Sequence, residues 1–170
     1  RPRFVAKDGA GTQLVDEHPS ASGGPYGHDD ALAAILAWID GRTVGATITA
    51  AGHRVVHGGV RYPAPVLLAP DVLDWLDTLV PLAPLHQPHN LAAIRALTKL
   101  RPEVPQVACF DTAFHTTQPP VAQAFALPHV LAEAGIRRYG FHGLSYEYIA
   151  SVLPDYLGGA AAGRVVVAHR

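Results

Sequence analysis

The segment Gln106-Val107-Ala108-Cys109-Phe110-Asp111-Thr112 decides the fold class. It joins a short apolar run to a carboxylate, a pattern typical of a buried strand that ends at a polar sheet edge. Ligands of open α/β sheets bind at the carboxyl ends of strands, which makes Asp111 a candidate site residue. The structural alternative for Asp111 is a helix or turn cap.

Segments with helical and extended periodicity alternate around this strand. The first residues predict a hairpin over 4–15 with a glycine-rich turn, followed by a loop over 18–27. Further strands are predicted near 46–50 and over 165–167, and helices over 30–40, from Asp71, from Asn90, and from Ser145 to about Leu153. The last three helices each begin at a residue type that caps helix N-termini. This alternation favours an α/β protein.

The composition sets limits on the class of protein. The chain has 170 residues, 49% of them hydrophobic, and a formal net charge of −1. This size and charge favour one domain with no nucleic-acid or membrane partner. No leader and no apolar stretch near the ~20 residues of a membrane span is evident, so a cytoplasmic protein is expected. The chain starts at Arg1, contains no methionine and ends on a strand-like run, so we expect it to be part of a longer protein.

Three further segments carry candidate site residues. Arg54 lies in His53-Arg54-Val55-Val56-His57-Gly58-Gly59, where a guanidinium at a strand end suits an oxyanion. His86 lies in Pro81-Leu82-Ala83-Pro84-Leu85-His86-Gln87-Pro88, a stiff loop. His142 lies between glycines in Arg138-Tyr139-Gly140-Phe141-His142-Gly143-Leu144-Ser145, at the start of a helical pattern that favours anions. A surface ion pair for Arg54 and a structural role for His86 are the alternatives.

Metal and phosphate-loop motifs are not evident. The chain has ten histidines, but Pro88 between His86 and His89 argues against a helix that presents both as ligands. The sequence contains no H-E-x-x-H motif and no cysteine cluster, so no metal ligand is assigned. The only lysines are Lys7 and Lys99, and no G-x-x-x-x-G-K-[ST] motif occurs. Any phosphate would therefore be bound by arginine, histidine and backbone amides.

Four motifs, taken in their order and spacing, resemble the acetate kinase (acetokinase) family, which includes propionate and butyrate kinases. These motifs are H-R-V-V-H-G-G, P-L-A-P-L-H-x-P, F-D-T-A-F-H and R-Y-G-F-H-G-x-S. The resemblance implies a partial actin-like, sugar-kinase-like ATPase domain (ribonuclease H-like), with a mixed sheet and flanking helices. It also implies transfer of the ATP γ-phosphoryl group to the carboxylate of acetate, with propionate as the alternative substrate. Full-length family members use ATP and Mg²⁺ and are homodimers.

The resemblance also implies roles for individual residues. Asp111 and His142 match the catalytic carboxylate and the transition-state histidine, while Arg54 and His86 match residues of the substrate and phosphoryl site. The apolar residues that would enclose the acyl tail are Val56, Leu85 and Phe141. His169 matches the start of a phosphate loop that binds the nucleotide.

The family's first strand and phosphate loop would precede Arg1, and its C-terminal domain would follow Arg170. Residues 1–170 are therefore expected to form one incomplete domain, the acyl-substrate lobe, with a hairpin and loop over 1–27 and an α/β core over 28–170. Alone, this portion is expected to be inactive and to bind no cofactor tightly, and its dimerisation stays open. The alternatives are a non-catalytic remnant or binding module and, less favoured, a His/Asp metal-dependent hydrolase.

Overall fold

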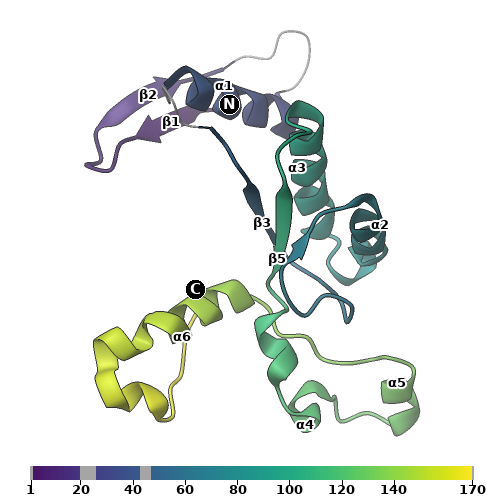
Figure 1. Ribbon diagram of the computed structural model, residues 1–170. Coiled ribbons are helices and arrows are strands. Elements are labelled where there is room, and N and C mark those ends of the chain that lie inside the picture. The colour runs from purple at the N-terminus through teal and green to yellow at the C-terminus, as the bar shows by residue number, and fades with distance from the viewer. Residues whose placement is uncertain (1, 20–25, 43–46, 170) are drawn as a thin grey trace. The chain divides into compact units, whose positions relative to one another are not determined.

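A computed structural model describes residues 2–19, 26–42 and 47–169 (Figure 1). The chain forms two compact units, residues 1–47 and 48–170. The candidate site residues all lie in the second unit. None of the helices in the described ranges is long and apolar enough to cross a membrane. The expectation of a single incomplete domain stays a prediction.

The first unit contains a hairpin and a helix. Strands β1 (Phe4–Lys7) and β2 (Gln13–Glu17) pair in antiparallel fashion. The Asp8 side chain accepts the N–H groups of Ala10 and Thr12 at 2.9 and 2.8 Å, which closes the turn. The predicted hairpin is therefore confirmed. Helix α1 (His28–Arg42) confirms the helix predicted over 30–40 and continues past Gly41.

The second unit is built on a mixed three-stranded sheet, as predicted. Strands β3 (Ala51–Val55), β5 (Gln106–Phe110) and β4 (Val66–Leu67) lie in that order, with β3 parallel and β4 antiparallel to β5. Helices α2 (Pro70–Thr78) and α3 (Gln87–Leu100) and the short 3₁₀ helix η1 (Val80–Leu82) lie between β4 and β5 in the sequence. This crossover brings the carboxyl ends of β3 and β5 to one sheet edge.

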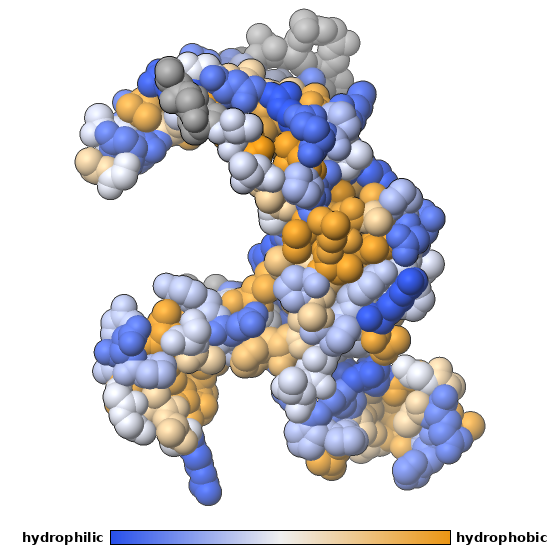
Figure 2. Space-filling model, in the orientation of Figure 1, coloured by the Kyte–Doolittle hydropathy of each residue, from blue (hydrophilic) through white to orange (hydrophobic). Residues whose placement is uncertain are grey.

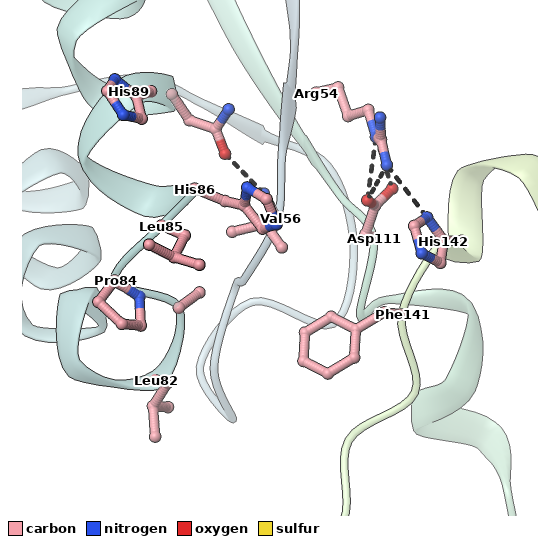
Figure 3. Close-up of a pocket in the computed structure, with 12 residues that line it drawn as sticks. Arg54, Val56, Leu82, Pro84, Leu85, His86, His89, Asp111, Phe141 and His142 are labelled. Carbon is pink, nitrogen blue, oxygen red and sulfur yellow. Dashed lines mark hydrogen bonds and ion pairs between the residues drawn. The ribbon is translucent and has the colours of Figure 1, made fainter.

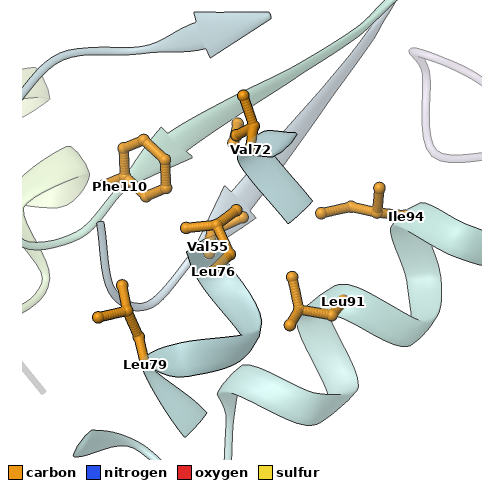
Figure 4. Close-up of a cluster of buried hydrophobic side chains, with 8 residues drawn as sticks. Val55, Val72, Leu76, Leu79, Leu91, Ile94 and Phe110 are labelled. Carbon is orange, nitrogen blue, oxygen red and sulfur yellow. The ribbon is translucent and has the colours of Figure 1, made fainter. Parts of the chain in front are cut away.

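The core lies between this sheet and helices α2 and α3 (Figure 4). Its buried members are Val55, Val72, Leu76, Leu79, Leu91, Ile94, Ala108 and Phe110. Side chains alternate between the two faces of a strand. Because Val55 and Phe110 point into the core, Arg54 and Cys109, which pair in the ladder, occupy the opposite face. Asp111 continues that alternation, which brings it to the same face as Arg54.

Short helices follow β5 before one long helix. They are η2 (Phe114–Thr117), α4 (Pro120–Gln123) and α5 (His129–Glu133), followed by α6 (Gly143–Leu157) and η3 (Gly158–Ala162). Apolar side chains reach the surface around α4 and α5 (Figure 2), including Val121 and Val130. Only a few buried contacts support this segment.

Several predicted boundaries are wrong. Residues 47–50 form no strand, and 43–46 lie outside the described residues; β3 begins at Ala51 because its partner begins at Gln106 and sets the register. Residues 165–167 form no strand, since no described segment pairs with them. Helix α6 continues through Pro154 to Leu157.

The three predicted caps, Asp71, Asn90 and Ser145, are also wrong. Their helices begin at Pro70, Gln87 and Gly143. A proline in the first turn has a helical φ and no N–H to satisfy, so Pro70 and Pro88 allow earlier starts. His89 consequently lies inside α3, and His86 directly precedes the helix.

Candidate active site

An ion pair between Arg54 and Asp111 lies at the carboxyl ends of β3 and β5. Arg54 Nε donates to both Asp111 carboxylate oxygens, at 3.1 and 2.9 Å, and Nη2 donates to Oδ2 at 2.7 Å. The Asp111 side chain is 3% exposed and that of Arg54 is 62% exposed. The hydrogen bond to Asp111 raises the pKa of Arg54. The carboxylate thus fixes one edge of the guanidinium, while further N–H groups on Nη1 remain for a ligand.

His142 completes this cluster from the start of α6. Its Nδ1 lies 3.3 Å from Arg54 Nη2. Arginine only donates, so Nδ1 accepts and the neutral ring carries its proton on Nε2. His142 has φ 57° and ψ 25°, the left-handed conformation. Such strain is typical of functional sites.

The backbone of Asp111 holds His142 in this conformation. Gly143 N–H donates to the Asp111 carbonyl at 2.7 Å. A Cβ on Gly143 would lie 2.9 Å from the Phe114 Cβ and 3.1 Å from the Asp111 carbonyl carbon. Only glycine therefore allows this approach, which explains the Gly after His142. Asp111 orients Arg54 with its side chain and His142 with its backbone.

A pocket of about 700 Å³, here called the Arg54 pocket, opens onto this cluster (Figure 3). In this view Leu85 and Pro84 lie on the left, and Arg54, Asp111 and His142 lie on the right. The lining residues are Arg54, Val56, Leu82, Ala83, Pro84, Leu85, His86, His89, Asn90, Asp111, Phe141 and His142. The structure therefore brings together all seven residues predicted for catalysis and substrate binding.

The walls of the Arg54 pocket differ in chemistry. Val56, Leu85 and Phe141 supply apolar parts of the lining, although Leu85 is 78% exposed and Phe141 is 39% exposed. His86 directly precedes α3 and is also exposed. A cation and hydrogen-bond donors thus face apolar carbon, an arrangement that suits a small ligand with one anionic and one apolar end.

His115 positions Phe141. Its Nε2 donates to the Phe141 carbonyl at 2.9 Å. The His115 ring lies so close to Gly140 that no Cβ fits there. The two glycines flanking Phe141-His142 thus each admit a close contact from the segment after β5.

Sequence reasoning missed the amides that hold the strand end. Asn90 Oδ1 accepts the Val56 N–H at 3.0 Å, and Gln87 Nε2 donates to the His57 carbonyl at 3.1 Å. Gln87 is fully buried. Both residues lie in the first turn of α3. Their side chains therefore bind backbone groups just past the end of β3, where the hydrogen bonds to β5 stop. The sequence signal for these contacts was the pair of amide side chains, Gln87 and Asn90, spaced one helical turn apart.

His57 is buried beneath the site. Its Nδ1 accepts the Gly59 N–H at 2.9 Å, and its ring meets Tyr139 edge-on with centroids 4.4 Å apart. Burial lowers the pKa of His57. A neutral imidazole that donates from Nε2 is therefore the stable form. Its contacts are structural.

His169 lies beside the cluster. Its ring stacks on His142 with centroids 4.2 Å apart, and its Nδ1 lies 3.2 Å from Ser145 Oγ. It is not among the residues that line the Arg54 pocket. The predicted nucleotide-site residue is thus next to the candidate catalytic histidine.

Metal ligands do not cluster in the described part of the chain. No group of three or more His, Cys, Asp or Glu residues there is placed to hold a metal ion. The one carboxylate in the cluster, Asp111, already binds Arg54. These residues therefore do not fit a Mg²⁺ site by themselves.

Comparisons with known proteins identify relatives of this chain. Residues 5–170 match the model of the acetokinase family. A curated acetate kinase of Rhodopseudomonas palustris is 53% identical over 171 residues, which is 99% of this chain and 42% of that protein. The chain therefore spans less than half the length of this relative.

Solved structures share the fold. A propionate kinase of Francisella tularensis has a TM-score of 0.80 at 33% sequence identity. The match covers 91% of this chain and 39% of the propionate kinase chain. An acetate kinase of Porphyromonas gingivalis has a TM-score of 0.76 at 34% identity and covers 92% and 39%. These neighbours confirm the expected actin-like, sugar-kinase-like fold class. On the match over residues 5–170 and the identity to these relatives, the chain belongs to the acetokinase family.

Proposed function

We propose that this chain supplies the acyl-binding side of a kinase that transfers the γ-phosphoryl group of ATP to acetate, giving acetyl phosphate and ADP. One observation carries the proposal: Arg54 and His142 line the same pocket as the apolar side chains of Val56, Leu85 and Phe141. The names of the relatives, acetate kinase and propionate kinase, fit a ligand with a carboxylate and a short apolar tail.

Arg54 binds the substrate carboxylate in this proposal. Its Nη1 donors take up the acetate oxygens while Asp111 holds Nε and Nη2. The methyl group then contacts Val56 and Phe141. Acetate is already ionised at neutral pH, so Asp111 has no proton to remove. Asp111 therefore acts by fixing the arginine.

His142 stabilises the transferring group. An acetate oxygen attacks the γ-phosphorus of ATP, the new O–P bond forms, and the bond to the β-phosphate oxygen breaks, leaving ADP. Charge on the equatorial oxygens needs donors that are already in place. Nε2–H of His142 is such a donor, since its Nδ1 faces Arg54. His86 lines the same pocket and supplies a second imidazole on the opposite wall.

Other roles stay proposals. ATP binding is implied by the family, and Mg²⁺ with it, but the described residues hold no metal cluster and no step is assigned to the ion. The metal-dependent hydrolase and the non-catalytic binding module remain alternatives to this function. Cytoplasmic location, the homodimer and the inactivity of these 170 residues by themselves also remain predictions. A pocket of about 700 Å³ has room for either acid, so a preference between acetate and propionate would come from the residues that contact the acyl tail.

The test uses the protein expressed from its complete reading frame. Acetyl phosphate is trapped with hydroxylamine after incubation with ATP and acetate. We expect acetate-dependent product that is lost in Arg54→Ala. Arg95→Ala, which removes an exposed ion pair between Arg95 on α3 and Asp77 on α2, should keep wild-type activity. Wild-type protein that makes no acyl phosphate from either acetate or propionate would contradict the proposal and favour a non-catalytic binding module.

A further inference from the structure

We propose that Asn90 sets the width of the Arg54 pocket and thereby the preference for two-carbon over three-carbon acids. It does so as a positioning residue that acts through Val56. The proposal rests on the proposed function and adds the determinant of acyl-chain length. Neither Asn90 nor Gln87 was among the residues predicted from the sequence to form the site.

The first step concerns the end of β3. The ladder with β5 finishes where Asp111 N–H donates to the Val55 carbonyl at 3.0 Å. Val56 lies beyond it, and the Val56 N–H is bonded to the side chain of Asn90 instead, at 3.0 Å. Val56 forms part of the apolar wall. The position of that wall residue therefore depends on one side-chain hydrogen bond.

The second step concerns the opposite wall. Asn90 N–H donates to the His86 carbonyl at 3.0 Å, and His86 follows Leu85 directly. One residue is thus bonded to both walls of the pocket: through its backbone to the Leu85-His86 loop, and through its side chain to Val56. The Asn90 side chain thus contributes to the distance between Val56 and that loop. Asn90 also lines the pocket.

The third step concerns what remains when this bond is lost. The side chain of Gln87, buried in the same first turn, donates to the carbonyls of His57 and Leu76 at 3.1 and 3.2 Å. The strand end therefore stays attached to α3 without Asn90. Loss of the Asn90 bond should free Val56 locally and leave the fold intact, so the pocket widens instead of collapsing.

The effect should appear in substrate selectivity. One methylene in an apolar pocket changes specificity by about 10- to 200-fold when the wall fits closely. In Asn90→Ala the ratio of kcat/KM for acetate to kcat/KM for propionate should therefore fall by about 10-fold, mostly through a lower KM for propionate. A merely structural residue would change both acids equally.

Asn90→Asp provides the rescue. Its carboxylate keeps an acceptor at the same reach for the Val56 N–H, so the ratio should return to the wild-type value. The added charge repels both substrate carboxylates, so KM rises for both acids by a common factor that cancels in the ratio. Thr98→Val is the matched control, because it removes a hydrogen bond to Gln106 from the other end of α3, outside the pocket.

The experiment measures initial rates with both acids in the protein expressed from its complete reading frame. A relaxed ratio in Asn90→Ala, restored in Asn90→Asp and unchanged in Thr98→Val, supports the proposal. If Asn90→Ala does not fold, Asn90→Ser, whose hydroxyl is too short to reach Val56, is judged by the same criterion.

Two results would overturn the role of Asn90 and leave the proposed function standing. The first is an unchanged ratio in Asn90→Ala, which includes an equal rise of KM for both acids, as expected of a direct contact with the carboxylate. The second is a ratio in Asn90→Asp that is as relaxed as the ratio in Asn90→Ala. Wild-type protein that phosphorylates neither acid overturns the proposed function, and the role of Asn90 with it.

Discussion

Replacing Gly143 with alanine tests whether the position of His142 matters. The added Cβ would lie 2.9 Å from the Phe114 Cβ, whereas ordinary contact begins at 3.4 Å, so the backbone must retreat by at least about half an ångström. The Asp111 carbonyl oxygen is closer still. This retreat stretches the 2.7 Å bond from Gly143 N–H and draws His142 away from Arg54.

Two magnitudes follow from this displacement. Overpacking of this kind destabilises a fold by about 1–3 kcal/mol. A misplacement of about 1 Å costs about 100-fold in rate, so half of that should lower kcat by about 10- to 100-fold. The KM for acetate should change little, since Arg54 and Asp111 keep their side-chain bonds. The expected signature is a loss in kcat that exceeds the loss in stability.

The assay combines initial rates with thermal unfolding. Gly52→Ala is the control, because nothing lies within 4 Å of its added Cβ in the same unit. It should keep wild-type kcat. A folded Gly143→Ala protein with wild-type kcat would refute the reasoning, because His142 would then tolerate displacement without effect.

Three further outcomes are expected. Arg54→Lys should raise the KM for acetate by about 10- to 100-fold in initial-rate assays, since a lysine loses the planar donor set and a charged hydrogen bond contributes about 1.5–3 kcal/mol. Phe110→Ala should lower the free energy of unfolding by about 3–5 kcal/mol in urea titrations, because Phe110 is fully buried. Burial lowers the pKa of His57, so the unfolded chain binds a proton that the folded chain does not. The free energy of unfolding should therefore fall as the pH drops below about 6.5, by at most about 1.4 kcal/mol per pH unit for this residue. In His57→Asn, the free energy of unfolding from urea titrations at several pH values should depend less steeply on pH.

The fold was predictable where local pattern and long-range pairing agree. The strand Gln106–Phe110 and the hairpin over residues 4–15 were predicted correctly, because each strand has a clear pattern and a turn or polar end. The two-residue strand β4 carries too little pattern to be seen, and β3 was misplaced because its partner sets its register. Local pattern alone does not contain that register.

The site was predictable for a different reason. Arg54 and Asp111 follow from the rule that parallel strands end at one sheet edge, and His142 from the glycines beside it. Asn90 was misread as a helix cap because an amide at a helix start is a common cap, and its partner Val56 is 34 positions away in the sequence. Such a contact depends on how α3 packs against β3, and no local rule contains it.

Asp111 explains why the arginine and the histidine act as one unit. Arg54 is long and mostly exposed, and without a fixed partner its guanidinium would sample many rotamers. The nearly buried carboxylate of Asp111 is stable only while a cation pairs with it, so each group holds the other. The same residue's carbonyl holds Gly143 N–H and so orients His142. The side chain that fixes Arg54, the proposed substrate-binding cation, and the backbone atom that fixes His142, the proposed phosphoryl-stabilising imidazole, thus belong to one residue at the end of β5. A change that moves Asp111 therefore disturbs substrate binding and phosphoryl transfer together.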